Sequence, residues 1–194
     1  MSDKSLLEAH CQGDKEAFSE LVRRYGAIVL GYLTKLSGGR GQAEDLFQET
    51  FKRVHEKAYT LQSSRFKPWL FTIATRVALD GMRRKNRRRT VSLNEKLDCS
   101  GGGCGESDMA LVVDDNGGPA EQAMRTEQKE QVRRAIAMLP ERQRATLVLA
   151  YYQQLTYREV AEVLDCSIGT VKAQMYRAVR TLAVKLPTVG KGLE

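Results

Sequence analysis

Hydrophobic residues recur every three or four positions along the first 89 residues, which is the spacing of one face of an α-helix. The pattern starts after Gly13-Asp14, a pair typical of a helix stop followed by an N-cap, and is interrupted at Ser37-Gly38-Gly39. On either side of that interruption the apolar stripe consists of Phe18, Leu21, Val22 and Tyr25, and then of Ala43, Leu46, Phe47, Thr50, Phe51 and Val54. The sequence therefore predicts that this part of the chain is helical.

Residues 69–89, WLFTIATRVALDGMRRKNRRR, join an apolar stripe to a block of cations. The stripe predicted to face inward is Trp69, Leu70, Ile73, Ala74 and Val77, and the residues predicted to lie outside are Thr72, Thr75, Arg76, Asp80 and Arg83. From Arg83 onward nearly every residue is cationic, and such neighbours repel one another unless they meet phosphates. We therefore expect a helix anchored in a core at one end and directed at nucleic acid at the other. A nonspecific basic arm is the alternative.

A polar loop precedes this helix. The stretch LQSSRFKPW, residues 61–69, places Arg65 and Lys67 beside Phe66 and Trp69. Aromatic side chains next to cations suit unstacked, single-stranded bases. The alternative is that the two rings belong to the core, and for Trp69 this is the favoured interpretation.

Residues 155–182, LTYREVAEVLDCSIGTVKAQMYRAVRTL, contain a dense set of helix start and stop signals. Thr156 and Glu159 have the spacing of a capping box, which begins a helix. Asp165-Cys166 leaves room only for a tight turn, and Asp tolerates the left-handed backbone conformation that such a turn requires. Ser167 can then cap a second helix. Two short helices joined by a turn of three or four residues form a helix-turn-helix.

The second of these helices has two different faces at about 100° per residue. Ile168, Val171, Met175, Ala178, Val179 and Leu182 cluster on one side; Gly169, Thr170, Ala173, Tyr176, Arg177 and Arg180 lie opposite, with Lys172 and Gln174 at the flanks. Small residues let a helix approach base edges, and Arg can reach guanine or phosphate. No Asp or Glu occurs between Ser167 and Leu186, whereas ordinary exposed helices mix both signs of charge. DNA contact is therefore favoured over a merely solvated helix face.

Residues 90–120 differ from both flanking regions. The runs SGGGCGESD and DDNGGPAE are glycine-rich and acidic, a composition typical of flexible linkers. Lys and Arg outnumber Asp and Glu by 18 to 10 in residues 1–89 and by 12 to 8 in residues 121–194, but the ratio is 1 to 6 in the linker. The sequence predicts an all-α protein: two small helical domains, 1–89 and 121–194, joined by a flexible linker, with the helix-turn-helix in the second. Two basic domains favour a nucleic-acid partner.

Composition narrows the class of protein further. Hydrophobic residues make up 42% and charged residues 28%, as in ordinary globular proteins. No apolar run approaches the roughly 20 residues of a membrane span, and the N-terminus lacks a secretory segment. We expect a cytoplasmic protein without membrane insertion, in which the four cysteines (Cys11, Cys99, Cys104 and Cys166) are reduced thiols.

Three other classes of function are less well supported. An enzyme would need a phosphate-binding glycine loop or a nucleophile–His–acid arrangement; neither is evident, so no catalytic residue and no cofactor is predicted. Cys99 and Cys104 are spaced more loosely than zinc-binding pairs, so no metal ligand is assigned, although a metal or redox site stays a minor alternative. A helix-turn-helix regulator that binds duplex DNA by itself would explain residues 121–194 but leave residues 1–89 without a role.

Four motifs in this order resemble the extracytoplasmic-function sigma factors of bacteria. They are GDKEAFSELVRRY, AEDLFQETFKRV, WLFTIATRVALDGMRR and LPERQRATLVLAYYQQLTYREVAEVLDCSIGTVKAQMYRA, and they cover nearly the whole chain outside the linker. The resemblance implies a protein that binds core RNA polymerase, recognises and melts the promoter −10 element with its first domain and recognises the −35 element with its second. It also implies an anti-sigma partner that holds the protein inactive.

The resemblance assigns roles to individual residues. Those implied to bind core polymerase are Asp45, Leu46, Gln48, Glu49 and Lys52; those implied to bind the −10 element are Ser63, Ser64, Arg65, Phe66, Lys67, Arg76, Arg83 and Arg84; those implied to bind the −35 element are Ser167, Thr170, Lys172, Ala173, Gln174, Tyr176, Arg177 and Arg180. The chain has Arg76 where the family often has Asn, and Ala173-Gln174 where it often has Ser-Arg. Because Gln can bond adenine bidentately, the −35 preference is expected to differ from the common one.

Overall fold

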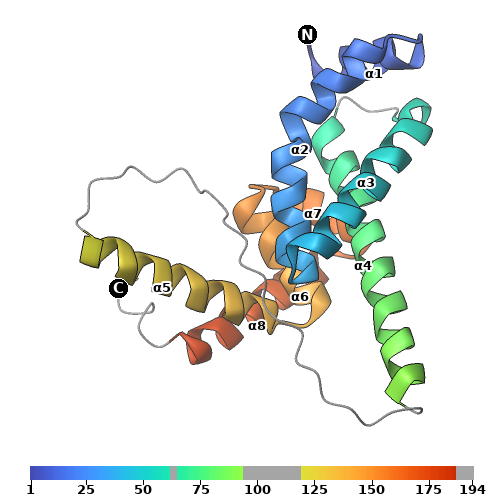
Figure 1. The fold of residues 1–194 in the computed structure, drawn as a ribbon. Helices are drawn as coiled ribbons and strands as arrows, with labels where there is room; N and C mark the ends of the chain where they lie inside the picture. The colour runs from blue at the N-terminus through green and yellow to red at the C-terminus, as the bar shows by residue number, and fades with distance from the viewer. Residues whose placement is uncertain (62–64, 94–118, 187–194) are drawn as a thin grey trace.

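The computed structural model describes residues 1–61, 65–93 and 119–186. In the first domain α1 (Asp3–Cys11), α2 (Lys15–Ser37), α3 (Arg40–Glu56) and the 3₁₀ turn η1 (Ala58–Thr60) are followed by the long helix α4 (Phe66–Leu93). In the second, α5 (Pro119–Ala137) and α6 (Glu141–Leu147) lead through a π-helical turn, η2 (Val148–Tyr152), to α7 (Tyr157–Leu164) and α8 (Ile168–Lys185). Every regular element of these residues is helical, which confirms the all-α prediction (Figure 1).

The turns between the first helices form where the sequence predicts them. Asp14 caps α2 by accepting hydrogen bonds from the backbone N–H groups of Glu16 and Ala17, after Gly13 at φ 101°. Gly38 ends α2 in the left-handed conformation at φ 78°. A side chain is strained in that conformation, so glycine suits both positions.

Helices α2, α3 and α4 pack side by side around one core, with α1 across the N-terminal end of α2 (Figure 1). Leu21, Val29 and Leu33 of α2 are fully buried, as are Leu70 and Phe71 of α4. The ring of Phe71 meets the ring of Tyr32 edge-on, with the centroids 5.1 Å apart. Burial of these large apolar groups is the main stabilising contribution to the domain.

Two details of α4 differ from the sequence-based expectation. Thr75, expected outside, is 1% exposed and shares a hydrogen bond of 2.6 Å with the Tyr32 hydroxyl. Helix α4 continues to Leu93 and α5 begins at Pro119, so both ends of the predicted linker are helical. The rest of the predicted linker, residues 94–118, lies outside the described residues.

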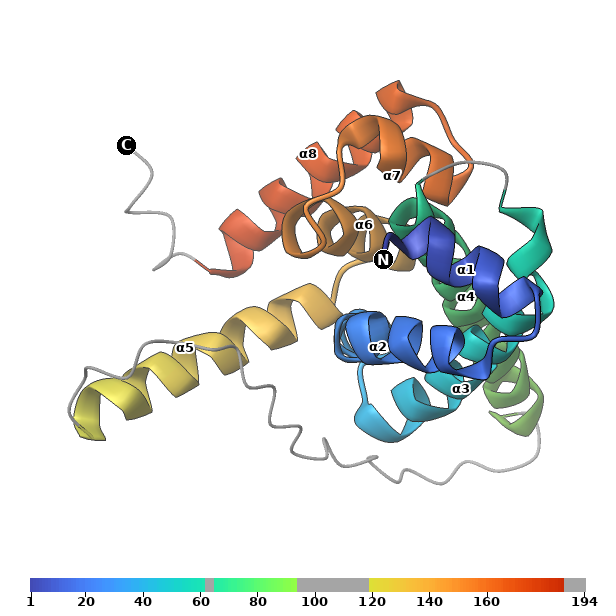
Figure 2. The same ribbon diagram turned by 90° about the horizontal axis from the view of Figure 1, so that it is seen from above.

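The second domain packs α7 and α8 against α6 and η2, and α5 against one end of α8 (Figure 2). Its core holds Leu149, Val160, Val171 and Ala178, each fully buried. This core fixes the angle between the two helices of the helix-turn-helix, and so determines which side of α8 faces outward.

The two domains touch each other. Helix α7 lies against α4, and η2 and α5 lie against α2 (Figure 2). Polar groups join them at both places: the Arg65 guanidinium lies 3.2 Å from the Glu162 carboxylate, and Arg144 donates a 2.6 Å hydrogen bond to the Leu36 carbonyl.

Candidate nucleic-acid interface

The helix-turn-helix begins at a complete capping box. The Thr156 side chain accepts a hydrogen bond from the Glu159 backbone N–H, and the Glu159 carboxylate accepts one from the Thr156 backbone N–H at 2.9 Å. The Thr156 hydroxyl also donates to the Glu159 carboxylate at 2.8 Å, and this bond, together with the one from the Thr156 backbone N–H, lowers the pKa of Glu159 because both favour its ionised form. Asp165 then ends α7 in the left-handed conformation at φ 50°, and Ser167 caps α8 through the backbone N–H of Thr170. Each of these sequence predictions is confirmed.

The outward face of α8 carries most of the side chains expected to meet DNA. The exposed residues of that set are Ser167, Lys172, Ala173, Tyr176, Arg177 and Arg180, while Thr170 is half-buried. No acidic side chain interrupts the described part of α8. The face is therefore small near its N-terminus and cationic further along, with Val171 and Ala178 buried on the opposite side.

Gln174 lies differently from the other expected base contacts. Its side chain is half-buried, and its Oε1 atom is buried without a hydrogen-bond partner among the described residues. Its carbonyl oxygen therefore points away from the surface on which an adenine would lie, so in this conformation the amide cannot form a bidentate contact.

Only some of the residues predicted to bind the −10 element lie on the surface around the start of α4. Arg65 is exposed and Lys67 is half-buried, whereas Ser63 and Ser64 lie outside the described residues. The Phe66 ring is 2% exposed. It packs against the rings of Tyr25 and Trp69, at centroid distances of 5.1 and 5.8 Å, so it belongs to the core and does not stack on a base here. The sequence-based prediction placed Phe66 at the DNA, because an aromatic residue between two cations is equally compatible with stacking on a base and with packing in the core.

Arg76, Arg83 and Arg84 are exposed along α4, whose C-terminal half projects beyond the helices that pack on it (Figure 1). Their spacing places cations along the length of the helix, where they can follow a phosphate backbone. Lys85 in the same stretch donates a 3.0 Å hydrogen bond to the Gln42 side chain of α3.

The residues expected to bind polymerase lie on α3. Asp45, Gln48 and Lys52 are exposed, and Glu49 is half-buried and paired with Arg53 at 2.7 Å. Leu46 is 7% exposed and packs in the core, where its Cδ2 atom lies close to Gly81. It therefore packs beneath the exposed polar residues of α3, whereas the resemblance implied that it contacts polymerase directly.

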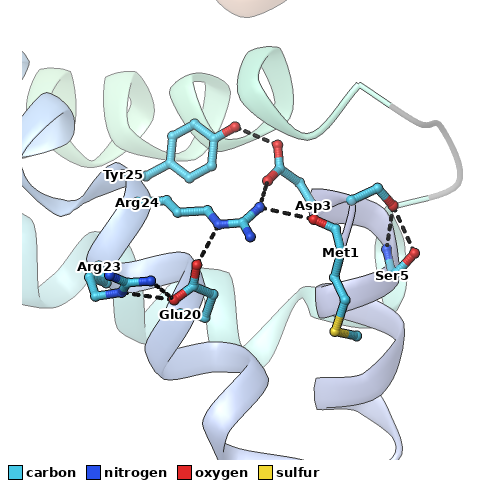
Figure 3. A network of polar contacts seen from close by, with 8 residues as sticks. Met1, Asp3, Ser5, Glu20, Arg23, Arg24 and Tyr25 are labelled. Carbon is cyan, nitrogen blue, oxygen red and sulfur yellow. Dashed lines mark hydrogen bonds and ion pairs between the residues drawn. The ribbon is translucent and has the colours of Figure 1, made fainter.

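A polar network at the N-terminus was not anticipated from the sequence (Figure 3). The Asp3 carboxylate accepts hydrogen bonds from Arg24 and from the Tyr25 hydroxyl, and Glu20 pairs with Arg23 at 2.6 Å and Arg24 at 2.7 Å. Burial and the bond to Asp3 raise the pKa of Tyr25. The i, i+4 spacing of Glu20 and Arg24 was visible in the sequence, but the contact with Asp3 depends on how α1 folds back on α2.

Few groups offer metal or redox chemistry. No cluster of three or more potential metal ligands occurs in the described parts of the chain. The rings of His10 and His55 lie at an angle to each other and next to the Phe18 ring, with the two imidazole centroids 4.9 Å apart. Cys99 and Cys104 lie outside the described residues, so the alternative of a linker site stays untested. Among the described helices, none is both long and apolar enough to cross a membrane.

Comparison with protein-family models gives two matches. Residues 21–88 match the model "Sigma-70 region 2", and residues 129–182 match the model "Sigma-70, region 4". The second match contains the helix-turn-helix and all of the candidate residues on α8; the first contains the candidate residues of α3 and α4.

Curated proteins are similar over nearly the full length. The ECF RNA polymerase sigma-E factor of Haemophilus influenzae is 30% identical over 96% of this chain and 96% of its own length. The RNA polymerase sigma-H factor of Pseudomonas aeruginosa is 31% identical over 91% of this chain and 89% of its own. The ECF RNA polymerase sigma factor RpoE of Cereibacter sphaeroides is 33% identical over 87% of this chain and 86% of its own.

Two solved structures share the fold. The sigma factor RpoE of Bartonella quintana, solved with the anti-sigma factor NepR, has a TM-score of 0.66 at 22% identity and covers 88% of this chain and 97% of its own. CnrH, solved with the cytosolic domain of CnrY, also has a TM-score of 0.66, at 21% identity, over 95% of this chain and 97% of its own. The helical arrangement of Figure 1 is thus one that sigma factors adopt.

Proposed function

The chain belongs to the extracytoplasmic-function sigma factors of bacterial RNA polymerase, and we propose that its two domains divide promoter recognition in the way its surfaces suggest. As a sigma factor it directs polymerase to promoters at transcription initiation. In the proposal, residues 1–89 bind core polymerase and the −10 element, and residues 121–194 bind the −35 element. Residues 90–120 link the two domains.

The observation that carries the proposal is the outward face of α8. Lys172, Arg177 and Arg180 are exposed beside the small side chain of Ala173, on a helix whose other side is buried in the domain core. A helix with this form can enter the major groove, where Arg reads guanine or holds phosphate. We assign base and phosphate contacts of the −35 element to these residues together with Ser167, Thr170 and Tyr176.

For the −10 element we propose that Arg65, Lys67, Arg76, Arg83 and Arg84 hold the DNA, together with Ser63 and Ser64, which precede them in the sequence. Phosphate contacts position a strand without reading its sequence. Phe66 has a supporting role in this proposal, because its ring packs under the start of α4 against Tyr25. Melting of the promoter would then depend on the two serines.

For polymerase we propose a contact through the exposed polar side chains of α3. Asp45, Gln48 and Glu49 lie one helical turn apart, so they can share a face, and Lys52 extends it. The ion pair between Glu49 and Arg53 keeps the Glu49 carboxylate oriented on that side.

The protein would act in the cytoplasm, with no catalysis of its own and no cofactor. We also propose an anti-sigma partner, because the sigma factor RpoE, which has the same fold, was solved in complex with the anti-sigma factor NepR. A partner of this kind would have to cover the polymerase-binding or DNA-binding surfaces described above.

The proposal is tested by transcription in vitro from a promoter mapped by sequencing transcript 5′ ends. Chain and core polymerase together should initiate there, and neither alone should. Removing both charges in Arg177→Ala/Arg180→Ala should reduce initiation by about tenfold or more. The slope of the logarithm of promoter affinity against the logarithm of salt concentration should become shallower, by the amount expected for the loss of about two phosphate contacts.

Lys185→Ala is the matched control, because Lys185 is an exposed cation in the last turn of the same helix and lies outside the proposed −35 set. Initiation by this variant should equal that of the wild type. Full activity of Arg177→Ala/Arg180→Ala at every salt concentration would contradict the −35 assignment. Tight sequence-specific footprinting by the chain alone would favour a polymerase-independent regulator.

A further inference from the structure

The chain has two histidines, and the fold brings them together at one end of the first domain. His10 lies in the last turn of α1 and His55 in the last turn of α3, and these two helix ends lie at the same end of the domain (Figure 1). The centroids of the two imidazole rings are 4.9 Å apart, with the ring planes at 50°. Phe18 of α2 packs against both rings, at centroid distances of 4.6 and 5.6 Å. Three helices therefore build this cluster.

The separation of the two imidazoles fits a shared metal ion. Zinc binds imidazole nitrogen at about 2.0–2.1 Å, and for ligand angles between 90° and tetrahedral this puts two ring centroids roughly 4.6–5.2 Å apart. The observed 4.9 Å lies within that range, so α1 and α3 need not move for both rings to reach one ion. Two packed rings without an ion can have the same separation. The state of the nitrogen atoms and the local charge therefore decide between the two interpretations.

The imidazole nitrogens have no competing partner. In the described part of the chain, neither ring forms a hydrogen bond or an ion pair. A neutral imidazole keeps one nitrogen with a free lone pair, and this is the atom that binds a metal. His55 is exposed and His10 is half-buried, so an ion with its water ligands can reach the pair from solvent. The Phe18 ring restricts the rotation of both imidazoles.

The position of the pair at two helix ends also favours a cation. The C-terminus of an α-helix carries a partial negative charge of about half an elementary charge, from its aligned peptide dipoles. Helix α1 ends at Cys11 and α3 ends at Glu56, so both imidazoles lie in such a field. The charge of Arg53, in the same turn of α3, is already matched by its 2.7 Å ion pair with Glu49.

We propose that His10 and His55 form a binding site for a borderline divalent transition-metal ion, with Zn²⁺ as the representative. Imidazole suits Zn²⁺ and Ni²⁺, whereas Mg²⁺ and Ca²⁺ prefer oxygen ligands. The described residues offer no cluster of three ligands, so water completes the coordination and the ion exchanges readily. The ion joins α1 to α3 as a structural ligand. It is no cofactor of promoter recognition, and the inference does not rest on the proposed function.

The first test is a direct titration. Thiolates also bind zinc, so the parent protein for this experiment is the full chain with Cys11, Cys99 and Cys104 replaced by serine. Isothermal titration calorimetry should give one Zn²⁺ per chain and no binding of Mg²⁺. His10→Gln and His55→Gln should each weaken Zn²⁺ binding by about tenfold or more, because even a group that only orients a metal ligand contributes roughly 10–100-fold to affinity.

Glu56→Gln is the matched control, because Glu56 is an exposed carboxylate next to His55 in α3. Its Zn²⁺ affinity should equal that of the parent. Circular dichroism of the metal-free proteins verifies that every variant is folded. Equal affinities of the parent and His10→Gln/His55→Gln would identify an adventitious ion only and overturn the proposal. A loss in Glu56→Gln as large as in the histidine variants would also overturn it, because binding would then follow surface charge.

Hydrogen exchange tests whether one ion joins the two helices, and it needs no histidine change in the parent. An ion held by both rings opposes the local opening of α1 by a factor that depends on the free ion concentration and its Kd. At a free Zn²⁺ concentration of about ten times Kd, exchange of the α1 amides should slow about tenfold. Amides of α8 in the other domain are the internal reference and should not change.

The same Zn²⁺ concentration should leave α1 exchange unchanged in His55→Gln, in which the ion has lost its ligand on α3. Binding of Zn²⁺ to the parent without slower exchange in α1 would mean that the ion sits on one ring only. That result would overturn the proposed connection between the helices.

Discussion

At the residue scale, the buried pair of Tyr32 and Thr75 shows how polar groups are accommodated in the first domain. The Thr75 hydroxyl donates to the Phe71 carbonyl at 2.6 Å, so it accepts the hydrogen bond from Tyr32. Both residues are at most 1% exposed, and burial raises the pKa of the Tyr32 hydroxyl. From the sequence alone, a threonine at this position is predicted to face solvent, because its hydrogen-bond partner Tyr32 lies far away in the sequence.

The pair predicts unequal costs for two substitutions. Tyr32→Phe should cost about 1 kcal/mol of unfolding free energy, because Thr75 keeps its bond to the Phe71 carbonyl. Thr75→Val should cost about 2–3 kcal/mol, because the Tyr32 hydroxyl is then buried without an acceptor. Urea unfolding followed by circular dichroism measures both.

The double variant is the control for this interpretation. If the bond is the cause, Tyr32→Phe/Thr75→Val should be less destabilised than the sum of the single changes. Strict additivity would mean that the two hydroxyl groups act independently.

At the element scale, the sequence predicted helix ends better than helix contacts. Asp14, Gly38, the Thr156–Glu159 box and Asp165 all act where they were expected, because caps depend on residues within a few positions of one another. Thr75 and Phe66 turned out to be buried, and whether such a residue faces solvent depends on which helix covers it. The roles of the outward residues of α3, α4 and α8 stay predictions.

Gly81 of α4 lies close to the Leu46 side chain of α3. A Cβ atom at this position would lie 2.9 Å from the Leu46 Cδ2 atom. Gly81→Ala should therefore destabilise the domain by about 1 kcal/mol, since overpacking outweighs the roughly 1 kcal/mol gained in helix propensity. Thermal unfolding of the two proteins compares their stabilities.

Gly41→Ala provides the matched change on α3, because nothing lies within 4 Å of a Cβ atom there. Only propensity then acts, so this variant should be neutral or slightly more stable. An equal gain in both variants would mean that the close approach at Gly81 has no energetic effect.

At the scale of the whole molecule, Arg144 connects the two domains. Its guanidinium donates to the Leu36 carbonyl on α2, to the carbonyl of Ala137, the last residue of α5, and to that of Leu139 in the following turn, at 2.6–2.9 Å. The Arg144 guanidinium thus binds both the α5–α6 turn of its own domain and the C-terminal end of α2 in the other domain. Partial burial lowers the pKa of Arg144, but the group stays ionised at neutral pH because arginine titrates far above it.

Arg144→Lys should remove this connection, since an ammonium keeps the charge but cannot reproduce the fork of donors. We expect a loss of about 2 kcal/mol or more and faster hydrogen exchange both at the C-terminal end of α2 and at the α5–α6 turn. Mass spectrometry of deuterium uptake checks this. Arg142→Lys, at an exposed position of the same helix, should leave both regions protected. Faster exchange at the turn alone would show that α2 does not depend on Arg144.

The sequence by itself determined the helical class, most of the helix ends, the helix-turn-helix and the sigma-factor family, and the comparisons confirm the family. All of these depend on short-range periodicity, on caps and on ordered motifs, whose physical causes lie within a few residues. Only the tertiary structure decided that Thr75 and Phe66 are buried, and that Arg65 and Lys67 meet the second domain. Those outcomes depend on contacts between residues far apart in the chain, where a single sequence carries no record of the partner.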